Sequence, residues 1–162
     1  MKKLIQISKY NENMNFAEEW TEICDCLPPV GTGTIAFSEY WKVESAYIIE
    51  ILNILEKISV SELVISYIEV RQKNSIAKKF KSKKIVKIDE LEYLIRSSLR
   101  QEISCKLYYS NILFIEFNYD MYVRIGINHP LSNNFVPVTK LITFKNISKD
   151  LEDKEYYVWG AN

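Results

Sequence analysis

The chain has 162 residues, of which 48% are hydrophobic and 26% charged, a composition that argues against a disordered or fibrous protein. Four glycines and four prolines leave little sequence for a flexible linker, so we expect one domain over residues 1–162. Basic and acidic residues number 21 each, so the whole molecule has no net field that would attract nucleic acid or an anionic membrane. With one histidine, most common catalytic centres are excluded, and we expect a non-enzyme without cofactor or metal.

Cellular location follows from the apolar runs and the cysteines. Leu4–Ile7 is broken by Gln6 and is too short for a signal peptide. No apolar run approaches the roughly 20 residues needed to span a bilayer. Cys24, Cys26 and Cys105 are odd in number and lack the spacing of a disulfide framework, which favours reduced thiols. We therefore expect a cytoplasmic protein.

The first third of the chain predicts a strand, a helix and a second strand. The short strand is Leu4–Ile7, and the helix begins after a cap at Asn15. Its apolar residues recur at helical spacing, and Pro28-Pro29 ends it. Those residues are Phe16, Trp20, Ile23 and Leu27. After a turn, Thr34–Phe37 is predicted to be a strand.

A second, longer helix is predicted over residues 43–58. Five apolar residues form one stripe along it, namely Val43, Tyr47, Ile51, Leu55 and Ile58. Glu50 and Glu56 fall off that stripe, so they are expected to stay exposed when the helix packs. With Glu44, they are the candidates in this helix for contact with a partner.

The middle of the chain predicts a buried strand and a further helix. Leu63–Val70 is nearly continuous apolar sequence, which is typical of a strand buried on both faces. Asp89 and Glu92 form a capping box, and Ile88 and Tyr93 form a hydrophobic staple at the start of the helix. Its buried stripe is predicted to be Leu91, Leu94, Ile95 and Leu99.

From Ile103 the apolar period changes to two, which predicts strands at 103–109, 112–118 and 122–127. A three-residue loop at 119–121 pairs Glu116 with Arg124 on one face. The same loop pairs apolar residues on the other face, Ile115 with Ile125 and Phe117 with Val123. Further strands are possible at 138–144 and 156–159. Mixed helices and strands followed by a run of strands predict an α+β domain, with a largely antiparallel sheet packed against two or three helices.

Four features of the sequence are candidates for catalysis or for binding phosphate or metal. The loop 28–34 contains no lysine and is followed by a predicted strand, so it lacks the chemistry of a phosphate loop. Cys24 and Cys26 lack a second ligand pair for zinc. Cys105 falls on the inward side of a strand and is interpreted as a core residue. His129, before Pro130, is a candidate general base without an evident nucleophile.

Charge is unevenly distributed along the chain. Residues 10–70 contain eleven acids and two cations, whereas residues 71–87 contain eight cations and no acid. Solvated helix faces and an exposed basic loop explain this pattern most simply. The alternatives are a nucleic-acid contact made by the segment 71–87 and an acidic face that occupies a basic partner. Phe80 is the only aromatic residue in the basic run, which disfavours a stacking platform for single strands.

The outward face of the late strands mixes aromatic and charged residues. It is predicted to consist of Lys106, Tyr108, Phe114, Glu116, Tyr122 and Arg124. Such a face is either covered by another element or used for binding, and coverage by a helix is the commoner arrangement. Tyr108, Glu116, Tyr122 and Arg124 are the candidates for contact with a partner.

In size, class and composition, and in its acidic stretch without catalytic residues, the whole chain resembles the immunity proteins of bacterial polymorphic-toxin and contact-dependent-inhibition systems. The resemblance implies a protein partner, a cognate toxin that the chain binds and blocks, often a basic nuclease met by an acidic surface. The basic segment 71–87 departs from a uniformly acidic inhibitor. The alternative is a nucleic-acid-associated or regulatory protein that uses this segment, and a third hypothesis is an enzyme centred on His129.

Overall fold

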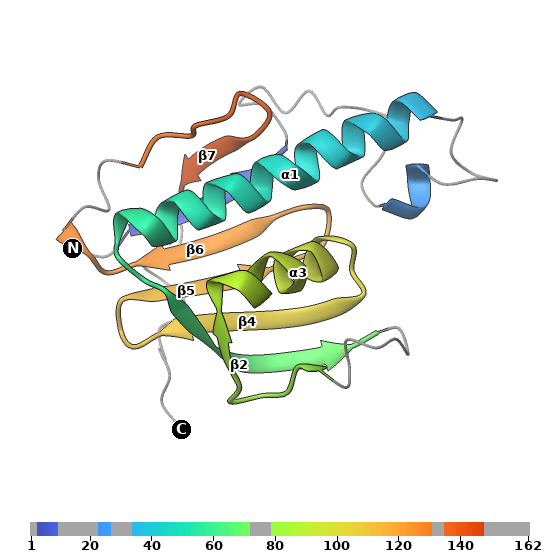
Figure 1. Cartoon of the computed structure of the whole chain (residues 1–162). Helices are drawn as coiled ribbons and strands as arrows, with labels where there is room; N and C mark the ends of the chain where they lie inside the picture. The colour runs from blue at the N-terminus through green and yellow to red at the C-terminus, as the bar shows by residue number, and fades with distance from the viewer. Residues whose placement is uncertain (1–2, 10–22, 27–33, 72–78, 131–134, 148–162) are drawn as a thin grey trace.

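The structure, a computed structural model, describes residues 3–9, 23–26, 34–71, 79–130 and 135–147. These residues form an open antiparallel sheet in the order β3-β2-β4-β5-β6-β1-β7 (Figure 1). Its strands are β1 (Lys3–Ser8), β2 (Glu62–Val70), β3 (Ile85–Lys87), β4 (Ile103–Tyr109), β5 (Leu113–Phe117), β6 (Val123–Ile127) and β7 (Thr143–Asn146). The sheet and its helices confirm the predicted α+β class.

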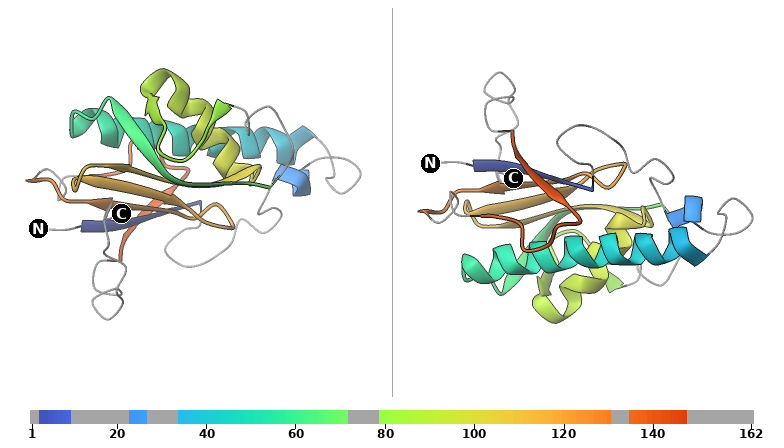
Figure 2. Two further views of the ribbon diagram at one scale, coloured as in Figure 1. Left: turned by 90° about the horizontal axis from the view of Figure 1, so that it is seen from below. Right: turned by 90° about the horizontal axis from the view of Figure 1, so that it is seen from above.

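The helices are α1 (Thr34–Lys57) and α3 (Ile88–Leu99), with a short 3₁₀ turn η1 (Ile23–Cys26). Both α-helices cover the same face of the sheet, as Figure 2 shows from two sides. We call this the helical face, and we call the opposite side of the sheet the open face. No helix in the described ranges packs on the open face.

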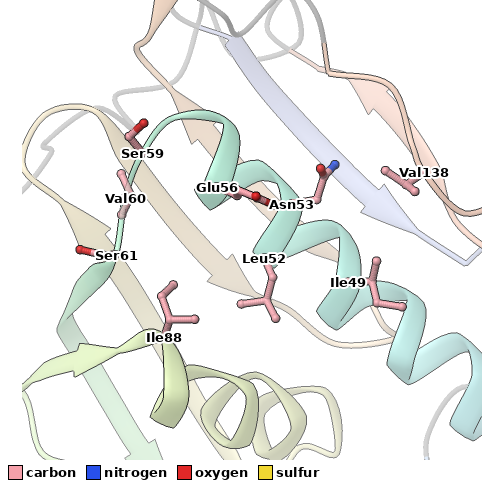
Figure 3. Close-up of a pocket in the computed structure, with 9 residues that line it drawn as sticks. All are labelled: Ile49, Leu52, Asn53, Glu56, Ser59, Val60, Ser61, Ile88 and Val138. Atoms are coloured by element: carbon pink, nitrogen blue, oxygen red, sulfur yellow. The ribbon is translucent and has the colours of Figure 1, made fainter.

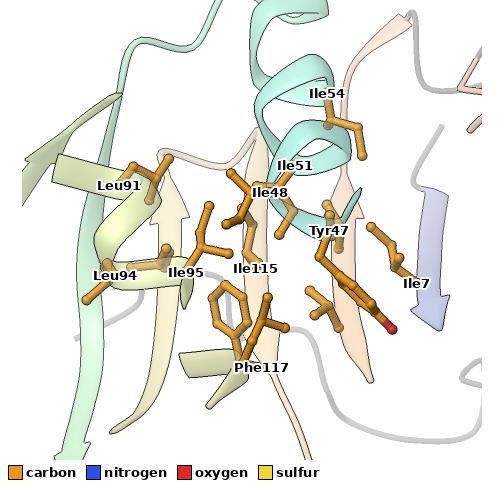
Figure 4. Close-up of a cluster of buried hydrophobic side chains, with 14 of the residues drawn as sticks. Ile7, Tyr47, Ile48, Ile51, Ile54, Leu91, Leu94, Ile95, Ile115 and Phe117 are labelled. Atoms are coloured by element: carbon orange, nitrogen blue, oxygen red, sulfur yellow. The ribbon is translucent and has the colours of Figure 1, made fainter. Parts of the chain in front are cut away.

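The core lies between the helices and the sheet. Ile51 of α1, Leu91 of α3 and Ile115 of β5 are fully buried there (Figure 4). Burial of each such side chain contributes roughly 1.5–3 kcal/mol. The Tyr47 hydroxyl donates a hydrogen bond to the backbone oxygen of Met121, which ties α1 to the β5–β6 turn.

Helix α1 begins earlier than predicted, and the strand predicted at Thr34–Phe37 is wrong. No glycine or proline interrupts residues 34–57, so the helix can extend N-terminally from its apolar stripe. Tyr40 is fully buried one turn before Val43. The rings of Phe37 and Trp41 meet edge-on, with centroids 6.1 Å apart. These i, i+3 and i, i+4 relations outweigh the weak strand preference of the preceding residues.

Strand β2 is covered on one face only, so the prediction of burial on both faces is wrong. The pairing with β4 shifts between Ile65 and Tyr67. This bulge inserts a residue, so Ile65 and Ile68 both pair with core residues of β4 although they are three positions apart. The bulge therefore explains the apolar run without a second buried face.

The predicted stripe of α3 is confirmed, because Leu91, Leu94, Ile95 and Leu99 are all buried. The predicted capping box is wrong. The N-cap is Lys87, whose side chain makes no capping hydrogen bond, and Lys87 is also the last residue of β3. Because β3 runs directly into α3, its pairing with β2 fixes where the helix begins.

The hairpin register is confirmed, with Glu116 opposite Arg124 and Ile115 opposite Ile125. Strand β7 begins at Thr143, later than the predicted strand at 138–144. The predicted helix after Asn15 lies outside the described residues except for 23–26, which form the 3₁₀ turn. The possible strand at 156–159 also lies outside them.

Candidate partner-binding surface

A row of polar side chains crosses the open face through six neighbouring strands. Strand pairing places its members side by side: Tyr67, Lys106, Glu116, Arg124, Gln6 and Lys145. Glu116 lies near the middle of this row. Its carboxylate is 2.7 Å from Lys106 Nζ and 3.8 Å from Arg124 Nη1. The predicted pair of Glu116 and Arg124 is thus part of a three-residue charge cluster.

An apolar row runs beside the polar one. Its members are Val64, Tyr108, Phe114, Gly126 and Leu4. The Phe114 ring lies directly over Gly126, where an added Cβ would be 2.1 Å from Phe114 Cε1. Glycine is therefore required for the ring to lie flat against the sheet. Tyr108 lies beside Phe114 on β4 and is half-buried.

One end of the open face carries exposed tyrosines and an arginine. The Arg71 guanidinium lies 4.5 Å from the centre of the Tyr119 ring. The Tyr67 hydroxyl donates a 2.8 Å hydrogen bond to Glu69 Oε2, which raises the pKa of Tyr67. Tyr67 is 43% exposed and Tyr119 is 61% exposed. Arginine and tyrosine are enriched at protein interfaces.

Glu44 is not on the surface, so its predicted role as a direct partner contact is wrong. Its side chain is fully buried between α1 and α3. Arg100 donates to it through Nε at 2.7 Å and through Nη2 at 3.1 Å, and Arg96 donates as well. Burial raises the pKa of the adjacent Tyr40 well above its usual range. The tyrosine therefore stays neutral and adds no second negative charge.

Glu50 is also fully buried, which contradicts its predicted exposure. Its Oε1 accepts hydrogen bonds from the backbone N–H groups of Val138 and Thr139, at 2.5 Å and 2.6 Å. The apolar stripe of α1 could not reveal this contact, because the partners lie far away along the chain. Glu50 anchors a loop and is unavailable to a partner.

Glu56 is exposed, as predicted. It lies on α1, on the helical face, whereas Tyr108, Glu116 and Arg124 lie on the open face. Tyr122 is half-buried just before β6 and donates its backbone N–H to the Tyr119 carbonyl at 3.1 Å. The predicted contact residues are therefore divided between two faces of the molecule.

The tyrosine cluster at the end of the open face was missed by sequence reasoning. Tyr67 lies on the open face because the bulge in β2 changes the alternation at that point. A simple period of two cannot locate it. The only sign of the bulge in the sequence is the nearly continuous apolar run of β2. Such a run can come from a bulge as well as from burial on both faces.

The remaining candidate residues are His129, Cys105 and the cations of the basic segment. His129 lies half-buried at a bend after β6. Burial raises the pKa of the Cys105 thiol to about 12, which keeps it protonated. Cys105 is buried, as its core assignment predicted. In the basic segment, Lys79 and Lys84 lie 3.7 Å and 3.1 Å from Glu90.

Comparison with protein-family models, curated proteins and solved structures finds no match for this chain. Within the described ranges, no three His, Cys, Asp or Glu residues are grouped so that they could hold a metal ion. Within the same ranges, neither helix is long and apolar enough to cross a bilayer.

Proposed function

We propose that this chain is a non-catalytic binding protein that binds and blocks a protein partner through the open face of its sheet. The observation that carries the proposal is the salt-bridged row of Lys106, Glu116 and Arg124 beside the aromatic row of Tyr108 and Phe114. The helices of the described chain pack on the other side (Figure 2). A sheet face of this composition, which no helix of the described ranges covers, suits an interface better than it suits solvent alone.

The charges on this face are already arranged in the unbound chain. Glu116 is 17% exposed at its side chain, whereas Lys106 and Arg124 are 53% and 37% exposed. The carboxylate therefore holds the two cations in place while both remain accessible. A partner with acidic groups opposite them would associate faster, and contacts with Tyr108 and Phe114 would add affinity.

We further propose that the partner is a toxin and that the chain acts as its immunity protein. Two features support this proposal. The chain resembles immunity proteins in size and class, and its open face is suited to binding a protein partner. Glu44 and Glu50 are fully buried, so they do not contribute to the acidic face first expected for this role. The partner surface would therefore be complementary to a mixed face with accessible cations.

A nucleic-acid contact through residues 71–87 is the weaker alternative. Lys79 and Lys84 are already close to Glu90, which reduces the net positive charge of this segment. Binding of nucleic acid by the full chain, falling steeply with salt, would favour the alternative.

Co-expression tests the proposed role. Each protein encoded beside this gene is expressed in a bacterial host, with and without the full chain. We expect one neighbour to arrest growth alone and to be tolerated when the chain is present in a stable complex with it. Failure of the chain to relieve any such arrest would contradict the immunity role.

A further inference from the structure

A groove of about 760 Å³ lies on the helical face, away from the open face. Ile49 and Leu52 of α1 and Ile88 of α3 line it, together with Val138 (Figure 3). Volumes of this size are typical of binding clefts in proteins.

The lining leaves apolar side chains accessible. Ile49 is 50% exposed, Ile88 is 37% exposed and Val138 is 63% exposed. Among the described residues that line the groove, Glu56 is the one charged side chain. This lining of apolar side chains with a carboxylate is complementary to a peptide segment that carries apolar side chains and one cation.

The Val138 wall is held in place from inside the protein. Phe135 and Ile142 are both buried and anchor the two ends of the loop 136–141. Between them, Glu50 accepts the backbone N–H groups of Val138 and Thr139. The other oxygen of Glu50, Oε2, has no hydrogen-bond partner within the described ranges.

Burying a carboxylate is costly unless it is well hydrogen-bonded. Here the buried carboxyl group holds the backbone at Val138 and Thr139, and the Val138 side chain lines the groove. Glu50 therefore contributes to the shape of the groove.

We propose that this groove is a second docking surface, which takes a peptide segment of a protein partner with apolar side chains and a lysine or arginine opposite Glu56. Glu50 is a positioning residue that holds Val138 in the groove wall. The inference does not depend on the open face, because the two surfaces lie on opposite sides of the sheet.

Selection from a phage-displayed library of random peptides of about 12 residues, with the full chain as target, tests the groove directly. We expect enriched peptides to combine apolar residues with lysine or arginine. Their affinity should fall about tenfold in Val138→Ser and in Ile49→Ser.

Charge reversal tests the role of Glu56. We expect Glu56→Lys to weaken the selected peptides by about fivefold and to favour versions whose cation is replaced by glutamate. Glu39→Lys is the matched control, because Glu39 is an exposed acid near the start of the same helix and outside the groove. It should leave the affinity unchanged.

A double-mutant cycle tests Glu50. Glu50→Ala should weaken peptide binding in the wild-type background and add nothing in the Val138→Ser background. It should also speed amide hydrogen exchange at Val138 and Thr139. If Glu50→Ala fails to fold, Glu50→Leu replaces it, because leucine has no acceptor for the two backbone N–H groups, and the same non-additivity is expected.

Three results would overturn the proposal. Selection could yield no peptide whose binding depends on Val138 or Ile49, or Glu56→Lys could act no differently from Glu39→Lys. Sedimentation velocity could instead detect a dimer that Val138→Ser abolishes, which would make a second copy of the chain the occupant. If a chain that still neutralises its toxin gives any of these results, the groove alone is rejected and the proposed function stands.

Discussion

The buried carboxylate of Glu44 joins the two helices, and its removal should be the most destabilising change in a charged side chain of α1. Its side chain is fully buried, whereas those of Arg96 and Arg100 are 20% and 21% exposed. The change Glu44→Gln keeps the shape of the side chain but removes the charge. Two arginines are then left without their shared counter-charge.

The expected loss is about 3 kcal/mol in the free energy of unfolding. Breaking a buried ion pair by removing one partner costs roughly 3–5 kcal/mol. The lower end applies here, because both guanidinium groups have access to water and can be partly rehydrated. Against a typical domain stability of roughly 5–15 kcal/mol, the variant should still fold.

Equilibrium unfolding in urea, followed by circular dichroism, measures this loss. Glu39→Gln is the matched control, since Glu39 is exposed on the same helix, and it should change stability by less than about 0.5 kcal/mol. The midpoint of Glu44→Gln should shift with an unchanged slope. Equal stabilities of the two variants would refute the assignment of Glu44 as the charged link between α1 and α3.

Three further predictions concern the sheet. Gly126→Ala should destabilise the fold in urea unfolding, because its Cβ would lie 2.1 Å from the Phe114 ring; Phe114→Ala in the same chain should recover part of the loss, and no recovery would count against the ring contact. Glu116→Lys should cost about 1 kcal/mol in the same assay, because it places three cations side by side on neighbouring strands; a stability equal to the wild type would contradict the charge cluster. Cys105, whose pKa burial raises to about 12, should react with a thiol reagent near pH 8 only as fast as the chain unfolds; rapid labelling of native Cys24→Ser/Cys26→Ser protein would disprove its burial.

Local patterns in the sequence were enough to predict the hairpin and the apolar stripes of α1 and α3. The pairing of Glu116 with Arg124 follows from matching charges and apolar residues across one short loop. The stripe of Leu91, Leu94 and Ile95 follows from helical spacing. In each case, the information lies within a few residues of the element itself.

The fate of Glu44 and Glu50 depends on partners distant in sequence. Both lie beside the apolar stripe of α1, and a solvated flank was the simplest expectation. In the fold, α3 covers one flank and brings Arg96 and Arg100 to Glu44. The loop 136–141 reaches Glu50 from the far end of the chain. No periodicity within residues 43–58 carries this information.

The most direct test of inhibition by binding uses the toxin that co-expression identifies. The active toxin is titrated with increasing amounts of the full chain. Inhibition should be complete at one equivalent of chain. Tyr108→Ala/Arg124→Ala should weaken binding by about tenfold, while Lys42→Ala, a control at an exposed cation on α1, should leave it unchanged. Complete inhibition by far less than one equivalent would indicate catalysis, and wild-type affinity of the open-face variant would contradict the proposed surface.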